Sequence, residues 1–204
     1  RFGSNNKWAT FPSFSLGWNI HREPWLSLPD WLSMAKARFS WGENGNEAIG
    51  NFRYTTLTSG DNNAVFGSPE QTVTGTKASG LANQSLRWET STQTDVGLDL
   101  GFFNGRIGLV IDWYKKMSKD MLMQLNLPSI MGTSGNASSA LAAPWGNYGD
   151  IENTGWEIAL NTQPIQTKNF SWSSDLQFSF NKNKLKSLSG STALPGYGQW
   201  TDVV

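Results

Sequence analysis

The sequence predicts an all-β protein, and more specifically a segment of a transmembrane antiparallel β-barrel with long extracellular loops. Apolar and polar side chains alternate over residues 86–102, with the apolar ones at even positions. Because successive side chains of a strand point to opposite faces, this stretch has one apolar face. It is longer than the usual strand of about five or six residues. A strand that crosses a bilayer needs roughly nine to eleven residues. A long strand of a soluble barrel is the alternative, and the recurrence of the pattern along the chain favours the membrane.

Six segments repeat this alternation, and none of them shows convincing helical periodicity. The predicted strands cover residues 8–20, 31–41 and 86–102, followed by segments that start at residues 106, 155 and 170. In the first three, the apolar face contains Trp8, Phe14, Leu16, Trp18, Ile20, Ala35, Ala37, Phe39, Trp41, Trp88, Val96, Leu98, Leu100 and Phe102. In the last three, it contains Ile107, Leu109, Ile111, Trp113, Trp156, Ile158, Leu160, Trp172, Leu176, Phe178 and Phe180. Val110 is the exception, an apolar residue on a polar face.

The connections between these strands run approximately over residues 21–33, 43–85, 103–105, 124–154 and 164–168. A single loop beyond about fifteen residues is unusual in a compact domain. Outer-membrane barrels, in contrast, have short periplasmic turns and long extracellular loops. The first, third and fifth strands are therefore expected to run toward the periplasm, and the other three to run outward.

Aromatic residues gather at the ends of the predicted strands, which indicates two belts at the membrane interfaces. Eleven of the 204 residues are tryptophan. The outer belt is predicted to contain Trp8, Trp41, Trp88 and Trp156. The periplasmic belt is predicted to contain Trp18, Phe102, Phe170 and Trp172. The alternative, aromatic residues in the core of a soluble β domain, explains their clustering at strand ends less well.

The composition argues against several classes of protein. The chain is 38% apolar with a mean hydropathy of -0.42, so no transmembrane helix is predicted. The zero net charge gives no sign of a nucleic-acid partner, and the absence of cysteine excludes disulfides and thiolate metal sites. No N-terminal signal peptide is visible, and six strands are too few to close a membrane barrel. We therefore expect a piece of a longer protein.

No catalytic residue, cofactor or metal is predicted. His21 is the only histidine, and it falls in a predicted periplasmic turn with no nucleophile to form a dyad. Several carboxylates could be mistaken for glycosidase acids, but their phase places them toward the lumen. Pairing with cations across strands, or contact with a plug, is the simpler interpretation. These carboxylates are Glu89, Asp95, Asp99, Asp112, Glu157 and Asp175, and the facing cations are Lys36, Arg38, Arg87 and Lys116.

A series of sequence blocks occurs in order along nearly the whole chain. They are Arg1-Phe2-Gly3, Phe11-Pro12-Ser13-Phe14-Ser15-Leu16-Gly17-Trp18, Ala37-Arg38-Phe39-Ser40-Trp41-Gly42-Glu43-Asn44-Gly45-Asn46, Leu86-Arg87-Trp88-Glu89-Thr90-Ser91-Thr92-Gln93, Gly97-Leu98-Asp99-Leu100-Gly101-Phe102-Phe103, Asp112-Trp113-Tyr114-Lys115-Lys116, Gly149-Asp150-Ile151-Glu152-Asn153-Thr154-Gly155-Trp156-Glu157 and Phe178-Ser179-Phe180-Asn181-Lys182-Asn183-Lys184. The series resembles the SusC/RagA family, the TonB-dependent outer-membrane transporters of Bacteroidota. Trp41 departs from the pattern, since tyrosine is common there.

This resemblance implies a barrel of about 22 strands whose lumen is filled by an N-terminal plug, with residues 1–204 forming part of the barrel domain. The plug, the TonB box and the final strands are expected outside this chain. The resemblance also implies a SusD-like surface lipoprotein that closes over the barrel, and oligosaccharide or peptide cargo. Transport would be driven through TonB, with no chemistry on the substrate, so no enzyme is expected.

Residues that contact cargo or the lid are expected in the outer loops, because aromatic faces suit sugar rings. The candidates are Tyr54, Phe66, Trp145, Asn147, Tyr148, Tyr197 and Trp200, with Trp145 and Tyr148 as the expected anchors. These side chains could equally pack the loops together. Two other functions stay open from the sequence. A soluble all-β carbohydrate-binding or adhesin module would bury its apolar face, and a passive porin would lack the plug.

Overall fold

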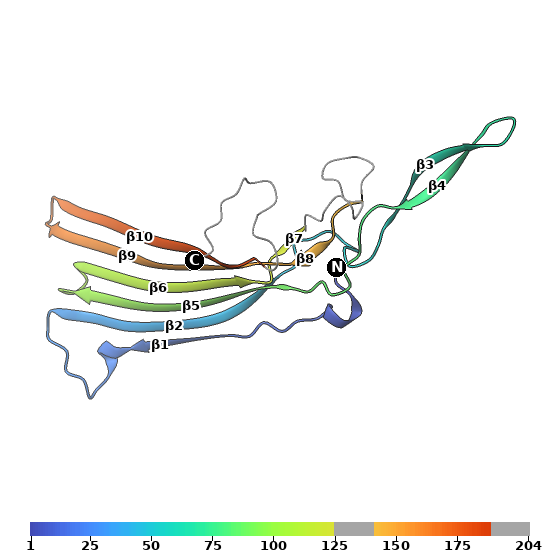
Figure 1. Ribbon diagram of the computed structural model, residues 1–204. Helices are drawn as coiled ribbons and strands as arrows, with labels where there is room; N and C mark the ends of the chain where they lie inside the picture. Colours follow the sequence, from blue (N-terminus) through green and yellow to red (C-terminus); the bar gives the residue numbers. More distant parts are fainter. Residues whose placement is uncertain (125–140, 189–204) are drawn as a thin grey trace.

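The computed structural model describes residues 1–124 and 141–188, apart from the side chains of residues 61 and 62. Its main element is a six-stranded antiparallel sheet with the strand order β1-β2-β5-β6-β9-β10 (Figure 1). The order in the sheet thus follows the order of these six strands in the sequence. The strands are β1 (Ser13–Asn19), β2 (Leu32–Asn46), β5 (Glu89–Phe102), β6 (Ile107–Lys119), β9 (Asp150–Gln166) and β10 (Ser171–Ser187). The prediction of six consecutive antiparallel strands is therefore confirmed.

The register of the sheet brings the apolar side chains of all six strands onto one face. Directly paired residues form rows that cross the sheet without interruption. One row consists of Leu16, Phe39, Val96, Trp113, Trp156 and Phe180, and the next of Trp18, Ala37, Leu98, Ile111, Ile158 and Phe178. A third row on the same face contains Ala35, Leu100, Leu109, Leu160 and Leu176. We call this surface the apolar face.

The opposite face is polar, and an ion cluster joins its strands. The guanidinium of Arg38 on β2 donates hydrogen bonds from Nε and Nη2 to Asp99 on β5, and Nη2 also donates to Asp112 on β6 at 2.8 Å. Gly97 lies between these groups, and a Cβ at this position would lie 2.7 Å from Nη2 of Arg38. The predicted cation–carboxylate pairing across strands is found at this cluster.

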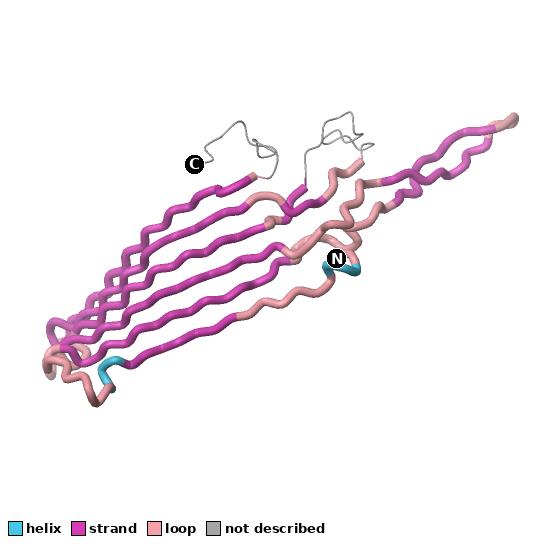
Figure 2. The backbone as a smooth tube through the Cα atoms, turned by 60° about the horizontal axis from the view of Figure 1, so that its bottom comes forward, coloured by secondary structure: helices cyan, strands magenta, loops and turns pink. Residues whose placement is uncertain are grey.

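The two ends of the sheet differ, as the connection lengths predicted. The β5–β6 and β9–β10 turns and the β1–β2 connection lie at one end, whereas the long connections β2–β5 and β6–β9 lie at the other (Figures 1 and 2). The β5–β6 turn places Phe103, Asn104 and Gly105 at positive φ, and Gly105 donates its N–H to the Phe102 carbonyl at 3.1 Å. Positive φ at two central residues is the geometry that suits the twist of a tight hairpin.

Several boundaries differ from the sequence prediction. β1 begins at Ser13, so Trp8 lies outside the strand, while β9 begins at Asp150 and β10 reaches Ser187. The long connection of residues 43–85 contains a hairpin that was not predicted, formed by β3 (Thr58–Phe66) and β4 (Gln71–Ala78). A further short pair consists of β7 (Leu122–Gln124) and β8 (Trp145–Asn147). In the described residues, no helix is both long and apolar enough to cross a membrane.

The exchange Gly155→Ala tests the packing of the polar face. The ring of Tyr114 lies over Gly155, and its hydroxyl reaches across β9 to donate to Oδ1 of Asn181 at 3.2 Å. An added Cβ would lie 2.5 Å from the Phe180 carbonyl oxygen and 2.6 Å from the Tyr114 ring. We expect a loss of about 1–3 kcal/mol in stability, as for other overpacked sites.

The measurement is the temperature at which the full-length receptor unfolds, read from the change in its mobility in gel electrophoresis after heating. Gly108→Ala is the matched control, because it lies on the same face and its Cβ would meet no atom closer than 3.8 Å. Equal losses in the two variants would contradict the role assigned to Tyr114.

Candidate functional site

The apolar face is a large surface that the described part of the chain leaves uncovered. Its exposed residues include Phe14, Leu16, Trp18, Val96, Leu98, Trp156, Leu176, Phe178 and Phe180. Soluble monomers rarely expose contiguous apolar patches larger than a few hundred Å². No charged side chain interrupts the three apolar rows described above. This surface is therefore suited to contact with hydrocarbon.

Aromatic residues lie at both ends of this face. At the end with the long connections, Trp41 packs against Phe14 at a centroid distance of 5.9 Å, and Trp156 pairs with Trp113, which the predicted outer belt did not include. At the other end, Trp31 stacks on Phe102 at 5.8 Å, and Trp18 stacks on Trp25 at 6.4 Å. Phe170 and Trp172 are exposed at the start of β10. Trp25 could not be found by strand alternation, because it lies in the β1–β2 connection, and Trp31, the first residue of a predicted strand, was not assigned to a belt.

The other two residues of the predicted outer belt have different surroundings. Trp8 precedes β1 and is 86% exposed. Trp88 packs against Phe2 at 5.2 Å and against Phe11 at 5.6 Å. It lies in a cluster formed by the long β2–β5 and β6–β9 connections, which we call the outer connections. Its indole Nε1 is buried without a hydrogen-bond partner in the described residues. The belts as a whole remain a prediction.

The outer connections are held together by a small hydrophobic core. Leu86 is fully buried with Phe2 and Ile49, and Tyr54, Trp88, Leu122 and Trp145 pack around them. We call this group the outer cluster. Its members come from the N-terminal segment, both long connections and the residues before β5. Two of the candidate contact residues, Tyr54 and Trp145, are thus used to pack the loops.

The side chain of Asn147 ties three of these segments together. Its amide nitrogen donates to the carbonyl of Arg87 at 2.8 Å and to that of Asp120 at 2.9 Å, while its oxygen accepts from the Arg87 N–H at 2.9 Å. Arg87 also pairs with Asp120 at 2.6 Å, and this hydrogen bond and charge raise the pKa of the Arg87 guanidinium. Both donor hydrogens of the Asn147 amide are therefore engaged within the protein.

The remaining candidate contact residues have different positions. The ring of Tyr148 lies over Gly146, and a Cβ added at Gly146 would overlap this ring. Phe66 lies at the end of β3 and is 62% exposed, in a hairpin that projects away from the sheet (Figure 1). The neck of this hairpin is closed by Ser79, whose N–H and hydroxyl both donate to the Leu57 carbonyl at 2.7 and 2.9 Å. Tyr197 and Trp200 lie outside the described residues.

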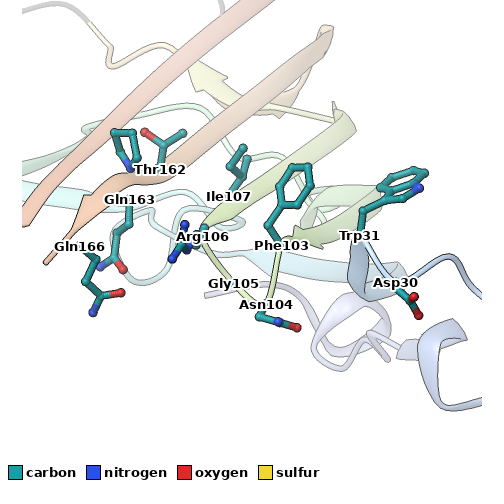
Figure 3. A pocket seen from close by; sticks show the side chains of 11 residues that line it. Asp30, Trp31, Phe103, Asn104, Gly105, Arg106, Ile107, Thr162, Gln163 and Gln166 are labelled. Atoms are coloured by element: carbon teal, nitrogen blue, oxygen red, sulfur yellow. The ribbon is translucent and has the colours of Figure 1, made fainter.

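A cavity of about 940 Å³ lies at the end of the sheet with the short turns. It is bordered by the β5–β6 turn, the end of β9 and the residues before β2. Figure 3 shows Trp31, Phe103 and Ile107 pointing to one side, and Asn104, Gln163 and Gln166 to the other. This division of apolar and polar side chains is typical of a membrane–water boundary. The cavity lies far from the outer connections on which the contact residues were predicted.

Five of the seven titratable residues considered as catalytic groups have structural partners: His21, Glu89, Asp95, Asp99 and Asp112. Nδ1 of His21 lies 3.0 Å from the Ala35 carbonyl oxygen. Asp95 accepts hydrogen bonds from Ser40 and Gln93, and Glu89 accepts one from the Leu122 N–H at 3.1 Å. With Asp99 and Asp112 bound to Arg38, these groups act in holding the sheet together.

Comparison with known sequences gives matches along nearly the whole chain. Residues 1–201 match the family model described as TonB dependent receptor-like, beta-barrel. The chain is 37% identical over 194 residues to the TonB-dependent receptor SusC of Bacteroides thetaiotaomicron, covering 93% of this chain and 18% of that protein. It is 37% identical over 188 residues to the TonB-dependent receptor P3 of Formosa agariphila, covering 92% of this chain and 18% of that protein. The chain thus spans about a fifth of the length of these relatives.

Solved structures show the same fold. The structure of the RagAB peptide transporter is similar with a TM-score of 0.79 and 29% sequence identity, over 96% of this chain and 20% of that one. The RagAB peptide importer in its open-open state gives a TM-score of 0.80 over 97% of this chain and 20% of that one, also at 29% identity.

The exchange Asn147→Ala separates a structural role of this residue from a role in cargo binding. Loss of the hydrogen bonds to the backbone of Arg87 and Asp120 should loosen the outer connections by about 0.5–1.5 kcal/mol. Hydrogen exchange of the backbone around Arg87 and Asp120 in the full-length receptor would report this loss. Gln84→Ala is the control, because Gln84 is exposed and its side chain has no partner in the described residues. If the Asn147→Ala variant showed unchanged hydrogen exchange but weaker cargo binding, Asn147 would instead be a ligand contact.

Proposed function

The chain belongs to the TonB-dependent receptor family as a segment of its outer-membrane β-barrel, and from this membership we propose that it serves the import of nutrients, oligosaccharides or peptides, together with a SusD-like surface lipoprotein. The family consists of transporters, so no chemistry on the cargo is required of these residues. The matched relatives include SusC and the RagAB peptide importer, which support this class of function. A soluble carbohydrate-binding or adhesin module does not agree with the family membership.

The observation that best supports the proposal is the separation of the two faces of the sheet. Three apolar rows cross all of β2, β5, β6, β9 and β10, while the opposite face contains the cluster of Arg38, Asp99 and Asp112. A strand that spans a membrane barrel has this alternation, with lipid outside and a polar lumen inside. We assign the apolar face to lipid and the polar face to the lumen, where a plug domain would contact it.

The remaining parts of the transport machinery are proposed to lie outside this chain. Residues 1–204 form part of the barrel domain of a longer receptor with about 22 strands. A plug and a TonB box elsewhere in that receptor would couple opening of the lumen to energy transfer through TonB. The six strands described here supply the wall along which cargo passes.

The β3–β4 hairpin is the proposed contact with the lid lipoprotein or with cargo. It carries three exposed apolar residues, Val65, Phe66 and Val73, and its two strands pair with each other in a separate sheet. Long loops on a rigid scaffold are where binding residues concentrate. Trp145 and Tyr148, the anchors expected from the sequence, are only partly exposed, so we place the contact on this hairpin instead.

The exchange Leu98→Arg tests the lipid assignment. Leu98 lies in the middle of the apolar face, where arginine would meet hydrocarbon at a cost of roughly 2–4 kcal/mol. Gln93→Arg is the control on the opposite face of the same strand, where a polar lumen should accept the charge. The measurement is a folding titration of the full-length receptor in lipid vesicles. Comparable losses in both variants would overturn the assignment of the faces.

The double exchange Phe66→Ser with Val73→Ser tests the hairpin contact. If these side chains are buried against the lid, pull-down of the lipoprotein should weaken at least about tenfold, since a buried aromatic anchor contributes 2 kcal/mol or more. If they contact cargo, growth on the cognate nutrient should fall while pull-down is retained. Thr72→Ala with Thr74→Ala is the control on the same hairpin. Wild-type behaviour in both assays would exclude this hairpin as the contact.

A further inference from the structure

Four lysines lie close together at the outer end of β6, β9 and β10. Lys115 on β6 and Lys182 on β10 are both paired with Thr154 of the central strand β9. Since neighbouring strands are about 4.8 Å apart, their backbones are separated by roughly 10 Å. Lys184 pairs with Glu152, which is two residues before Thr154 and therefore on the same face, and Lys186 follows at the end of β10. We call Lys115, Lys182, Lys184 and Lys186 the lysine cluster.

The cluster has more positive than negative charge. Glu152 is the carboxylate at its centre, and it pairs with Lys115 at 3.1 Å and with Lys186 at 3.0 Å. Lys182 and Lys184 form no ion pair with any residue of the described ranges. Asp150, the next carboxylate along β9, already accepts hydrogen bonds from the Ser187 hydroxyl and the Asp120 N–H. Within the described part of the chain, the ammonium groups of Lys182 and Lys184 thus have no carboxylate partner and can bind an anion.

The cluster lies directly beside the apolar face. The row formed by Lys115, Thr154 and Lys182 follows the row formed by Trp113, Trp156 and Phe180, with the side chains on the same side of the sheet. The lysines lie toward the long connections, at the end of the sheet assigned to the outer side. A molecule that contacted both rows would need an apolar part and, immediately next to it, an anionic head.

We propose that the lysine cluster binds the phosphate of a phosphorylated lipid headgroup in the outer leaflet of the membrane. This inference rests on the proposed function, because it requires the apolar face to lie in lipid. Acyl chains would cover the apolar rows, and tryptophan at the boundary suits the headgroup region. Lysine provides a flexible point charge for phosphate, and its aliphatic stem can cross the boundary to reach it. Glu152 fixes Lys115 and Lys186 on either side of the site.

The phosphate group distinguishes this site from general contact with lipid. The full-length receptor in detergent micelles would be titrated with diphosphoryl lipid A, with the same lipid after removal of its phosphates, and with inorganic phosphate. Native mass spectrometry would count the bound molecules. The exchange Lys182→Gln with Lys184→Gln should weaken lipid A binding by about 30-fold, the loss expected for two lysines near an anionic surface. Binding of the dephosphorylated lipid should not change.

The control exchange is Lys36→Gln with Lys116→Gln, which removes the same charge from the polar face of β2 and β6. It should leave lipid A binding unchanged. An equal loss in the control, or no preference of the wild type for the phosphorylated lipid, would overturn the site. Inorganic phosphate binding as tightly as lipid A would show an ion site in place of a lipid site, which also overturns it. Failure of the proposed function would look different, because the dephosphorylated lipid would not bind and Leu98→Arg would be tolerated.

Discussion

The register of the six-stranded sheet is the constraint on which the rest of the structure depends. Neighbouring residues of a strand point to opposite faces, so Ile111 is among apolar side chains while Asp112 binds Arg38. A shift of one residue in any strand pairing would exchange these positions. It would place carboxylates on the apolar face and leave the guanidinium without its partners. The proposed contact of one face with lipid and the ion pairing on the other face therefore favour the same register.

The sequence predicted the six strands well because each of them has two chemically different faces. The β3–β4 hairpin escaped prediction for the opposite reason. Both of its faces are exposed, and polar residues occur on both sides, with Thr72 and Thr74 on one and Gln71 on the other. The ends of β9 and β10 were also missed, since beyond the apolar rows charged residues such as Glu152, Lys182 and Lys184 occupy the positions that apolar residues hold in the rest of the strand. The periodicity thus reports the surroundings of a strand, and it ends where those surroundings become uniform.

The outer connections show a second limit of sequence reasoning. Asn147 and Trp145 were predicted to face a ligand because they are polar or aromatic residues in long loops. Their partners lie far away along the chain, as in the hydrogen bonds of Asn147 to Arg87, 60 residues away, and to Asp120, 27 residues away. No local pattern indicates such a partner. The outer cluster, by contrast, contains Phe2 and Leu86, which belong to the sequence blocks that carried the family resemblance.

The closed neck of the β3–β4 hairpin has a consequence for how such receptors diversify. Ser79 fastens the base of the hairpin to Leu57, so the residues beyond this point contribute little to holding the outer cluster together. Doubling the length of a closed loop costs only about 0.6 kcal/mol. Insertions, deletions and exchanges beyond the neck can therefore accumulate while the barrel wall keeps its register. The surface of the hairpin that we propose for recognition can therefore change in sequence and length while the six-stranded sheet stays the same.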